Sequence, residues 1–260
     1  MATMTSHSPG TFCWIELCST DAEGAKRFYT ALFGWAFRET PIPGGTYIMC
    51  QLDGHEVAAI YQMSAGEMAQ QIPSHWFNYI AVANVDETAE HVPALGGTVL
   101  TAPFDVMEHG RMAVIQDPTG AIVGVWQARR HPGVGVRDEP GAMCWNEVMT
   151  PDREKASAFY GKLIGWERSS MQIPDGEYTV FMAEGTPRGG CMQITPAMGP
   201  VPPGWLTYFA VADCDATVKR TGELGGKLLA GPENAPGVGR WATLQDPQGA
   251  VFCVIAAIAG

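Results

Sequence analysis

The amino-acid sequence contains two similar copies of one long stretch. The segment "CWIELCSTD" at residues 13–21 returns as "CWNEVMTPD" at 144–152, with Cys, Trp, Glu and Asp in the same places. "KRFYTALFGW" (26–35) likewise matches "SAFYGKLIGW" (157–166), and "GRMAVIQDPTGAIV" (110–123) matches "GRWATLQDPQGAVF" (239–252). A repeat of this length is a duplicated domain, because solenoid repeats have periods of only about 20–50 residues. The fold must therefore use one module twice.

The repeat sets the domain boundaries. We assign residues 12–127 to the first module and 143–260 to the second. Residues 128–142 form a linker, because "RRHPGVGVRDEPGA" combines structure-breaking Pro and Gly with charge. Residues 1–11 lack the charged start and apolar core of a secretory signal, so we expect a flexible N-terminal arm.

Each module is predicted to contain a strand, a helix and three strands, twice over. In the first module "WIEL" is a strand, and apolar residues then recur at helical spacing from 22 to 33, up to Gly34. Thr20 and Glu23 fit a capping box at the start of this helix. Further strands are expected near 46–52 and 57–62, at "FNYIAVA" (77–83), and at 98–101, 111–116 and 121–126, with a second helix over 86–95. This order predicts an α+β fold with mostly antiparallel sheets.

Charge and cysteine content bound the partners and the compartment. The formal net charge is −11, and no cluster of Lys and Arg offsets it, so nucleic acid is not an expected partner. No apolar run approaches the length of a membrane-spanning helix, so no membrane partner is expected either. The seven Cys include no CxxC pair and sit among apolar neighbours, which favours buried free thiols in a reducing cytoplasm. We expect a cytoplasmic monomer or homodimer.

The repeated motifs carry a family resemblance. W-x-E-x-x-x-x-D, followed by "FY", "L(F/I)GW", "GG", "GR" and "DPxGA", resembles the vicinal oxygen chelate superfamily, which includes glyoxalase I, bleomycin-resistance proteins and extradiol dioxygenases. The resemblance covers both modules and is closest to tandem actinobacterial-type proteins, some of them hydroxylase-like. It implies that each module consists of two βαβββ units, which form a curled sheet around a cavity. One such fold hosts many activities, so the resemblance leaves the chemistry open.

Metal-dependent members of the superfamily hold a divalent ion with His, Gln or Glu from the first and last strands of each unit. The resemblance places the first-strand ligand at Trp14 and Trp145, its second-unit counterpart at Phe77 and Leu206, and the last-strand ligands at Ala58, Gly189, Gly124 and Cys253. Apart from the Cys253 thiol, none of these side chains carries a metal-donor atom, and a divalent ion needs three or four protein donors. We therefore predict no cofactor and no metal ligand.

Aromatic and apolar side chains occupy the places of the ligands. Because side chains alternate along a strand, Trp14, Glu16 and Cys18 share one face, and Phe77, Tyr79 and Ala81 share another. Such a cavity is suited to a flat or apolar molecule, held by stacking and burial. The residues predicted to bind this ligand are Trp14, Tyr47, Phe77, Tyr79, Trp145, Tyr178, Leu206, Tyr208 and Cys253.

Glu16 and Glu147 are the candidate catalytic residues. A carboxylate beside Trp on an inner face loses solvation, which raises its pKa and suits it to proton transfer near neutral pH. The alternative is a structural role, in which each Glu binds a backbone amide or the Arg111 and Arg240 guanidinium groups of the "GR" motifs.

Further residues have a functional and a structural interpretation. His55, His75 and His109 occur in the first module alone; they are either a displaced site or ordinary loop histidines. Asp117 and Asp246 of the "DP(T/Q)G" motifs are predicted to be turn residues. Trp126 and Trp241 are unmatched aromatics that either shape the two cavities differently or belong to the core, and the thirteen Met either line the cavities or pack the interior.

Three functions remain open from the sequence. The first is binding or sequestration of an apolar or aromatic metabolite. The second is a metal-free tailoring enzyme, such as a hydroxylase-like enzyme, isomerase, cyclase or lyase, with Glu16 or Glu147 as acid or base. The third is a metal-dependent lyase of the glyoxalase I kind, with its divalent metal held by residues other than those aligned above.

Overall fold

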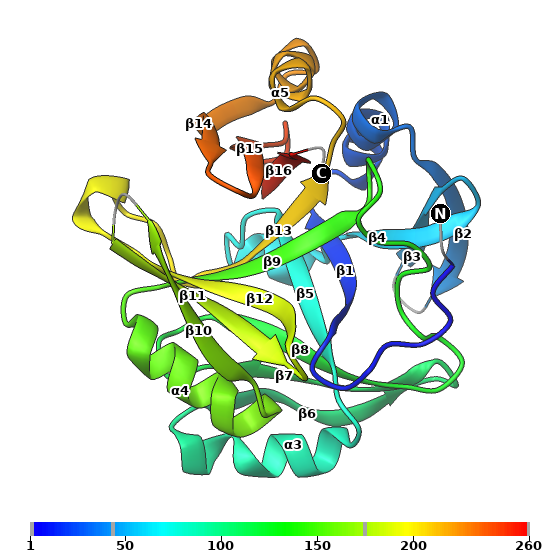
Figure 1. The fold of residues 1–260 in the computed structure, drawn as a ribbon. Helices are drawn as coiled ribbons and strands as arrows, with labels where there is room; N and C mark the ends of the chain where they lie inside the picture. Colours follow the sequence, from blue (N-terminus) through cyan, green and yellow to red (C-terminus); the bar gives the residue numbers. More distant parts are fainter. Residues whose placement is uncertain (1–2, 43–44, 174–175, 259–260) are drawn as a thin grey trace.

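The two modules form two large sheets that share one core (Figure 1). The computed structural model describes residues 3–42, 45–173 and 176–258. The first module consists of β1 (Phe12–Ser19), α1 (Ala22–Phe33), β2 (Ala36–Ile42), β3 (Gly45–Leu52), β4 (His55–Gln62), α2 (Ala65–Ala69), β5 (His75–Ala81), α3 (Val85–His91), the 3₁₀ helix η1 (Pro93–Leu95), β6 (Thr98–Val106), β7 (Gly110–Gln116) and β8 (Ile122–Ala128).

The second module repeats the order of the strands, with the 3₁₀ helix η2 (Pro196–Met198) in the place of α2. It consists of β9 (Met143–Thr150), α4 (Arg153–Ile164), β10 (Glu167–Ile173), β11 (Gly176–Ala183), β12 (Thr186–Gln193), the 3₁₀ helix η2 (Pro196–Met198), β13 (Gly204–Ala210), α5 (Cys214–Glu223), β14 (Lys227–Ala235), β15 (Gly239–Gln245) and β16 (Val251–Ala257). The prediction of two βαβββ units in each module is confirmed.

The strand order is the same in both sheets. The first sheet runs β2-β3-β4-β1-β5-β8-β7-β6, and the second runs β10-β11-β12-β9-β13-β16-β15-β14. Strand β1 lies parallel to β4 and antiparallel to β5, and β5 lies parallel to β8. All other pairs in the first sheet are antiparallel, as predicted. The first strand of each unit therefore lies at the centre of its sheet, where its side chains are furthest from the edges.

The start of helix α1 differs from the sequence prediction. The predicted capping box of Thr20 and Glu23 is wrong: the N-cap is Asp21, whose Oδ1 accepts a hydrogen bond of 2.9 Å from the backbone N–H of Gly24. Aspartate is among the preferred N-cap residues, and its charge also favours the helix N-terminus. The helix ends at Gly34, as predicted, because glycine adopts the left-handed φ of 74° without strain. Asp152 and Gly165 have the same roles in α4.

The predicted helix over 86–95 is divided in two. It is α-helical from Val85 to His91 and continues as η1 from Pro93. Proline has no N–H to donate to the preceding turn, so the regular α-helix cannot run through it.

The first helix of each module packs against the other module. The ring of Tyr29 on α1 lies 5.8 Å from that of Phe252 on β16, and its hydroxyl donates to Asp246 Oδ2 at 3.0 Å. In the other direction Trp166, which follows the C-cap of α4, packs on Phe12 at 5.9 Å, and its indole N–H donates to the Gly10 carbonyl at 2.9 Å. Asp246 Oδ1 also accepts the backbone amides of Gln248 and Ala250, which confirms the predicted turn role. The modules are thus joined by buried aromatic rings and by hydrogen bonds between them.

The N-terminal arm and the linker run side by side along the first module (Figure 1). The Met4 backbone N–H donates to the Gly135 carbonyl at 2.8 Å. Within the linker, Val134 N–H donates to Cys13 of β1 and Gly135 N–H to Glu56 of β4. The side chain of Val134 is fully buried. The part of the arm that the structure describes is therefore hydrogen-bonded to the linker, which itself packs on the first sheet.

Candidate functional site

The candidate site lies on the inner face of each sheet, where the strand register brings the predicted residues together. Trp14 pairs with Tyr79, and Glu16 pairs with Phe77, across β1 and β5. The second sheet repeats this register, with Trp145 opposite Tyr208 and Glu147 opposite Leu206. The family resemblance placed Trp14, Trp145, Phe77 and Leu206, and side-chain alternation along the strands added the glutamates and tyrosines that share their faces.

One predicted pair of positions lies on the opposite face. Ala58 and Gly189 do not share the face of the glutamates, because Ala59 pairs with Glu16 and Gly190 pairs with Glu147. The inner face at these places therefore carries Ala59 and Gly190, one residue later than the sequence predicted. Neither side chain has a donor atom for a metal.

A hydrogen-bonded cluster surrounds Glu16. The hydroxyl of Tyr79 donates to its Oε1 at 2.5 Å, and that of Tyr47 donates to Oε2 at 2.9 Å. Trp14 Nε1 donates in turn to the Tyr47 hydroxyl at 3.0 Å. Both carboxylate oxygens of Glu16 are therefore occupied by tyrosine hydroxyls.

The second module builds the same cluster around Glu147. Tyr208 donates to Glu147 Oε1 at 3.2 Å, and Tyr178 also hydrogen-bonds to this carboxyl group. Trp145 Nε1 donates to the Tyr178 hydroxyl at 2.9 Å. Trp and Glu recur on one strand face because they belong to this network, in which an indole orients a tyrosine and two tyrosines hold a carboxylate.

Burial raises the proton affinity of both carboxylates. The pKa of Glu147 is raised to about 6 by loss of solvent, and the hydrogen bonds from Tyr178 and Tyr208 limit the rise because they favour the charged form. The pKa of Glu16 is raised for the same reason, and Tyr79 and Tyr47 oppose the rise in the same way. The Glu147 carboxyl group can therefore exchange a proton near neutral pH, and the pKa of Glu16 is displaced in the same direction.

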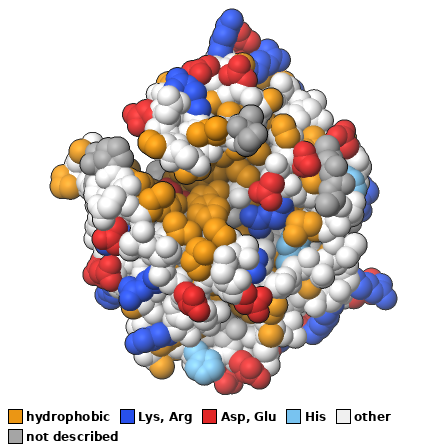
Figure 2. Space-filling model, in the orientation of Figure 1, with side chains coloured by type: hydrophobic (Ala, Val, Ile, Leu, Met, Phe, Trp, Pro, Cys, Tyr) orange, Lys and Arg blue, Asp and Glu red, His pale blue; other side chains and the backbone are white. Residues whose placement is uncertain are grey.

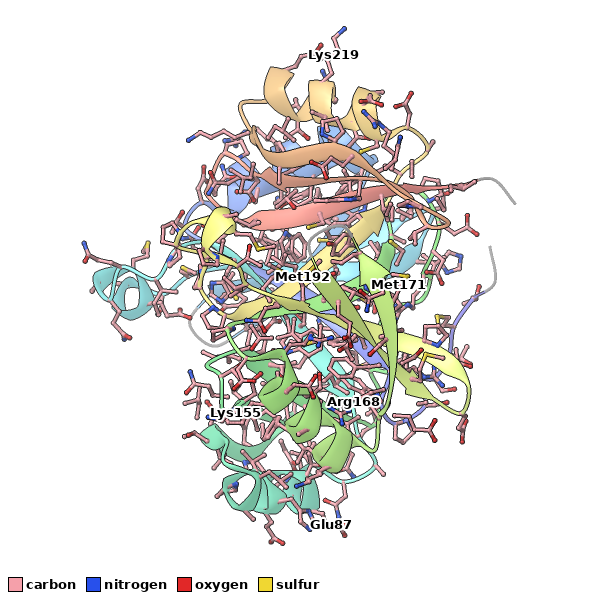
Figure 3. The ribbon with its side chains drawn as sticks, turned by 60° about the vertical axis from the view of Figure 1, so that its left-hand side comes forward. Glu87, Lys155, Arg168, Met171, Met192 and Lys219 are labelled. Atoms are coloured by element: carbon pink, nitrogen blue, oxygen red, sulfur yellow. The ribbon has the colours of Figure 1, made fainter. Side chains whose placement is uncertain are left out.

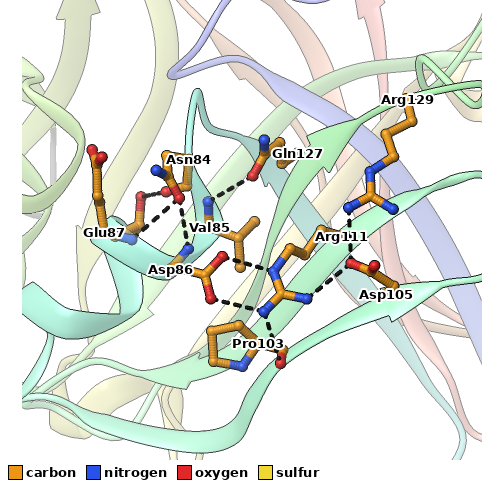
Figure 4. Close-up of polar contacts among 10 residues, drawn as sticks. Asn84, Val85, Asp86, Glu87, Pro103, Asp105, Arg111, Gln127 and Arg129 are labelled. Atoms are coloured by element: carbon orange, nitrogen blue, oxygen red, sulfur yellow. Dashed lines mark hydrogen bonds and ion pairs between the residues drawn. The ribbon is translucent and has the colours of Figure 1, made fainter.

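The structural alternative for Glu16 and Glu147 has different partners from those predicted. Arg111 does not reach Glu16: its guanidinium binds Asp86 at 2.7 Å and Asp105 at 2.8 Å (Figure 4). Arg240 binds Asp215 in the same way. The "GR" arginines therefore tie helices α3 and α5 to β7 and β15, and the side chains that hold the two glutamates are tyrosines.

The three histidines of the first module do not come together as a site. His75 Nδ1 lies 2.9 Å from the Pro73 carbonyl, at the start of β5. His55 begins β4, and His109 lies in the turn between β6 and β7, where its carbonyl accepts from Arg129. Residues 3–42, 45–173 and 176–258 contain no group of three or more His, Cys, Asp and Glu side chains placed to hold a metal.

The donor set of the inner faces does not fit the divalent ion of metal-dependent superfamily members. Each cluster offers one carboxylate, already bonded by two hydroxyls, beside indole and phenyl rings. Gly124 has no side chain, and a Cβ added there would lie 2.3 Å from Tyr79 Cδ1. Its counterpart Cys253 is fully buried, and burial raises the pKa of its thiol to about 12, so the metal-binding thiolate is disfavoured.

The two sites differ in what covers them. Trp14 is only 4% exposed, because the ring of the linker residue His131 packs edge-on against it at 4.4 Å. Trp145 is partly exposed, and Figure 2 shows a hydrophobic hollow over β9, β12 and β13. The sequence did not single out His131. Its linker contains two valines, Val134 and Val136, and the structure shows that both are buried against the protein.

The unmatched tryptophans both lie on inner faces. Trp126 on β8 is opposite Met112, while Trp241 on β15 is opposite Ile255. The indole of Trp126 also lies 6.0 Å from His131, so in the first module it closes the same end of the sheet as Trp14.

All seven Cys are free thiols.

Comparison with known proteins defines the family. Residues 11–125 match the model of the glyoxalase/bleomycin resistance protein/dioxygenase superfamily, and residues 143–255 match that of a glyoxalase-like domain. The candidate glyoxylase CFP32 of Mycobacterium tuberculosis is 44% identical over 98% of both chains. The anthracycline biosynthesis protein DnrV of Streptomyces peucetius is 36% identical, over 97% of this chain and 95% of its own. The protein belongs to the glyoxalase/bleomycin resistance protein/dioxygenase superfamily.

Solved structures show the same fold. The 2,3-dioxygenase LapB from Pseudomonas sp. KL28 superposes with a TM-score of 0.67 over 96% of this chain and 92% of its own, at 13% identity.

Among the described residues, no helix is long and apolar enough to cross a membrane.

Proposed function

We propose that the protein binds an apolar or aromatic small metabolite on the inner face of its curled sheets, without the divalent metal of other superfamily members. The observation that carries this proposal is the repeated Trp-Tyr-Glu-Tyr cluster. It puts a hydrogen-bonding carboxyl group at the base of an apolar wall. Small-molecule sites are typically built in this way, with a few polar groups among apolar and aromatic side chains.

The physical chemistry of this wall suits a flat ring. Burying one aromatic-ring-sized surface is worth on the order of 2–3 kcal/mol. Two such contacts and one hydrogen bond to the carboxyl group add up to micromolar affinity. Two relatives are named as anthracycline biosynthesis proteins, and an anthracycline contains flat fused aromatic rings.

Titration with a planar hydroxylated ring compound tests the proposal. Alizarin, a dihydroxyanthraquinone, is expected to quench tryptophan fluorescence in a saturable manner at micromolar concentration, whereas cyclohexanol is not. Calorimetry on the same samples separates binding from absorption of the exciting light. Failure of alizarin and of other planar aromatic probes to bind would contradict the proposal.

A metal-free enzyme is the second candidate, favoured by the raised pKa of Glu147. A carboxyl group with a pKa of about 6 suits proton transfer to or from a bound carbon acid. α-Tetralone, an aromatic ketone with exchangeable α-protons, is a direct probe in deuterated water. Deuterium uptake that is lost in Glu147→Gln, while circular dichroism shows that the fold is retained, supports catalysis, and uptake equal to that of buffer argues against it. Glu16→Gln tests the first module in the same way.

A further inference from the structure

The two inner faces differ in chemistry at four matching positions. Each of the four is separated from its counterpart by the same spacing as Cys13 from Cys144, which is the spacing of the repeat. In the second module all four are methionines: Met149 on β9, Met171 on β10, Met192 on β12 and Met198 in η2. In the first module the same places hold Cys18, Thr40, Tyr61 and Glu67.

The methionines gather at one side of the second site. Met149 and Met192 are cross-strand partners, and Met171 is the partner of Tyr178, whose hydroxyl belongs to the cluster around Glu147. Met192 and Met198 also line a cleft of about 190 Å³, beside the ion pair between Arg153 and Glu177. Figure 3 shows Met171 and Met192 between α4 and strands β14–β16. These thioethers form a polarizable, adaptable apolar wall of the kind that accepts flat rings.

The matching wall of the first module is polar. The Tyr61 hydroxyl donates to Glu67 Oε1 at 3.2 Å, and Cys18 is the cross-strand partner of Tyr61. An apolar ring placed here would remove water from the Glu67 carboxylate without giving it a new hydrogen bond. Glu67 keeps its hydrogen bonds from Tyr61 and Ser64, but a carboxylate that loses water next to an apolar ring is still costly, so this wall disfavours the ring.

The aromatic side chains on which a ring could stack also differ between the two modules, and their exposure favours the second module. In the first module Trp14 and Tyr79 are both buried, and His131 already packs on Trp14. In the second module Trp145 and Tyr208 are partly exposed, while Glu147 is buried below them. An indole open to solvent above a deep carboxyl group is the arrangement that a hydroxylated ring needs.

We propose that the ring-binding site lies in the second module alone, between Trp145, Leu206 and the wall formed by Met149, Met171, Met192 and Met198, so that each chain binds one planar aromatic molecule. This proposal rests on the proposed function and assigns it to one of two similar cavities. Glu147 orients the ligand by accepting a hydrogen bond from a phenolic hydroxyl. The first module's inner face is closed at Trp14 by the linker.

Reciprocal substitutions at one matched position test the assignment. Met192→Tyr gives the second module the residue of the first, and Tyr61→Met makes the reverse change. With alizarin as the probe in calorimetry, wild type is expected to bind one equivalent per chain. Met192→Tyr is expected to weaken binding at least tenfold, and Tyr61→Met to change it less than twofold. Met192→Gln, which keeps the length and flexibility of the side chain, replaces Met192→Tyr if the larger residue impairs folding.

The outcomes separate the two proposals. Wild type that binds no planar aromatic probe refutes the proposed function. Wild type that binds two equivalents, or that loses affinity in Tyr61→Met and not in either Met192 variant, leaves the proposed function intact and overturns the assignment to the second module. Circular dichroism and the melting temperature of each variant confirm that the fold is retained.

Discussion

The buried carboxyl group of Glu147 makes stability depend on pH in a way that its replacement by Gln should remove. Its folded-state pKa is about 6, against 4.5 for a solvated Glu. One pKa unit corresponds to about 1.36 kcal/mol, so the charged form costs the folded protein roughly 2 kcal/mol relative to the protonated form. Glu147 is 6% exposed, so water screens little of this cost.

The sign of the effect follows from proton binding. Between pH 4.5 and about 6, the folded state holds a proton that the unfolded state has released. The free energy of unfolding therefore falls as pH rises through this window, by roughly 2 kcal/mol, and this contribution is constant above it. In Glu147→Gln this fall is absent, because the amide does not titrate.

Urea unfolding at a series of pH values from 4 to 7.5 measures the difference. The free energy of unfolding of Glu147→Gln minus that of wild type is expected to grow by roughly 2 kcal/mol with rising pH. Glu177→Gln is the matched control: Arg153 lowers the pKa of the exposed Glu177, so this group titrates below the range in which Glu147 does, and the difference of this variant from wild type should stay flat as pH rises above 4.5. A Glu147→Gln difference that stays flat across this range would refute the argument that burial desolvates this carboxyl group.

Three further changes test the packing and the donor set. Asp246→Ala removes the acceptor of Tyr29 and of two backbone amides, and should cost about 3 kcal/mol, seen as a lower melting temperature; a loss below about 1 kcal/mol would argue against the inter-module hydrogen bond. Gly124→Ala places a Cβ 2.3 Å from Tyr79 Cδ1 and should cost about 1–3 kcal/mol in urea unfolding, whereas Gly45→Ala, which meets nothing within 4 Å, should not. Protein purified without chelator should contain well under one equivalent of Zn, Ni, Mn or Fe by elemental analysis and should melt unchanged after chelation; one equivalent would revive the metal-dependent alternative.

The fold was predictable from the sequence because the chain contains two copies of the same module. The apolar stripe of 22–33, the period-2 strands and the glycines at their ends each recur at matching places in the second module, so two weak signals support each other. The ends of the helices were less predictable, because neighbouring residues compete for the same capping position. Asp21 is the N-cap of α1 instead of Thr20, and Pro93 divides the predicted second helix. Register was the other weakness, because a slip by one residue moves Ala58 to the opposite face from Ala59.

The sequence by itself determined the two modules, their strands and the face that Trp14 and Glu16 share, because alternation and spacing are local properties of the chain. Only the tertiary structure decided that tyrosines from β3 and β5 hold Glu16, and that His131 of the linker covers Trp14. These contacts join residues that are far apart in the chain, so they depend on how the strands and the linker pack against one another. The same packing decides that the hydrophobic hollow opens over the second sheet.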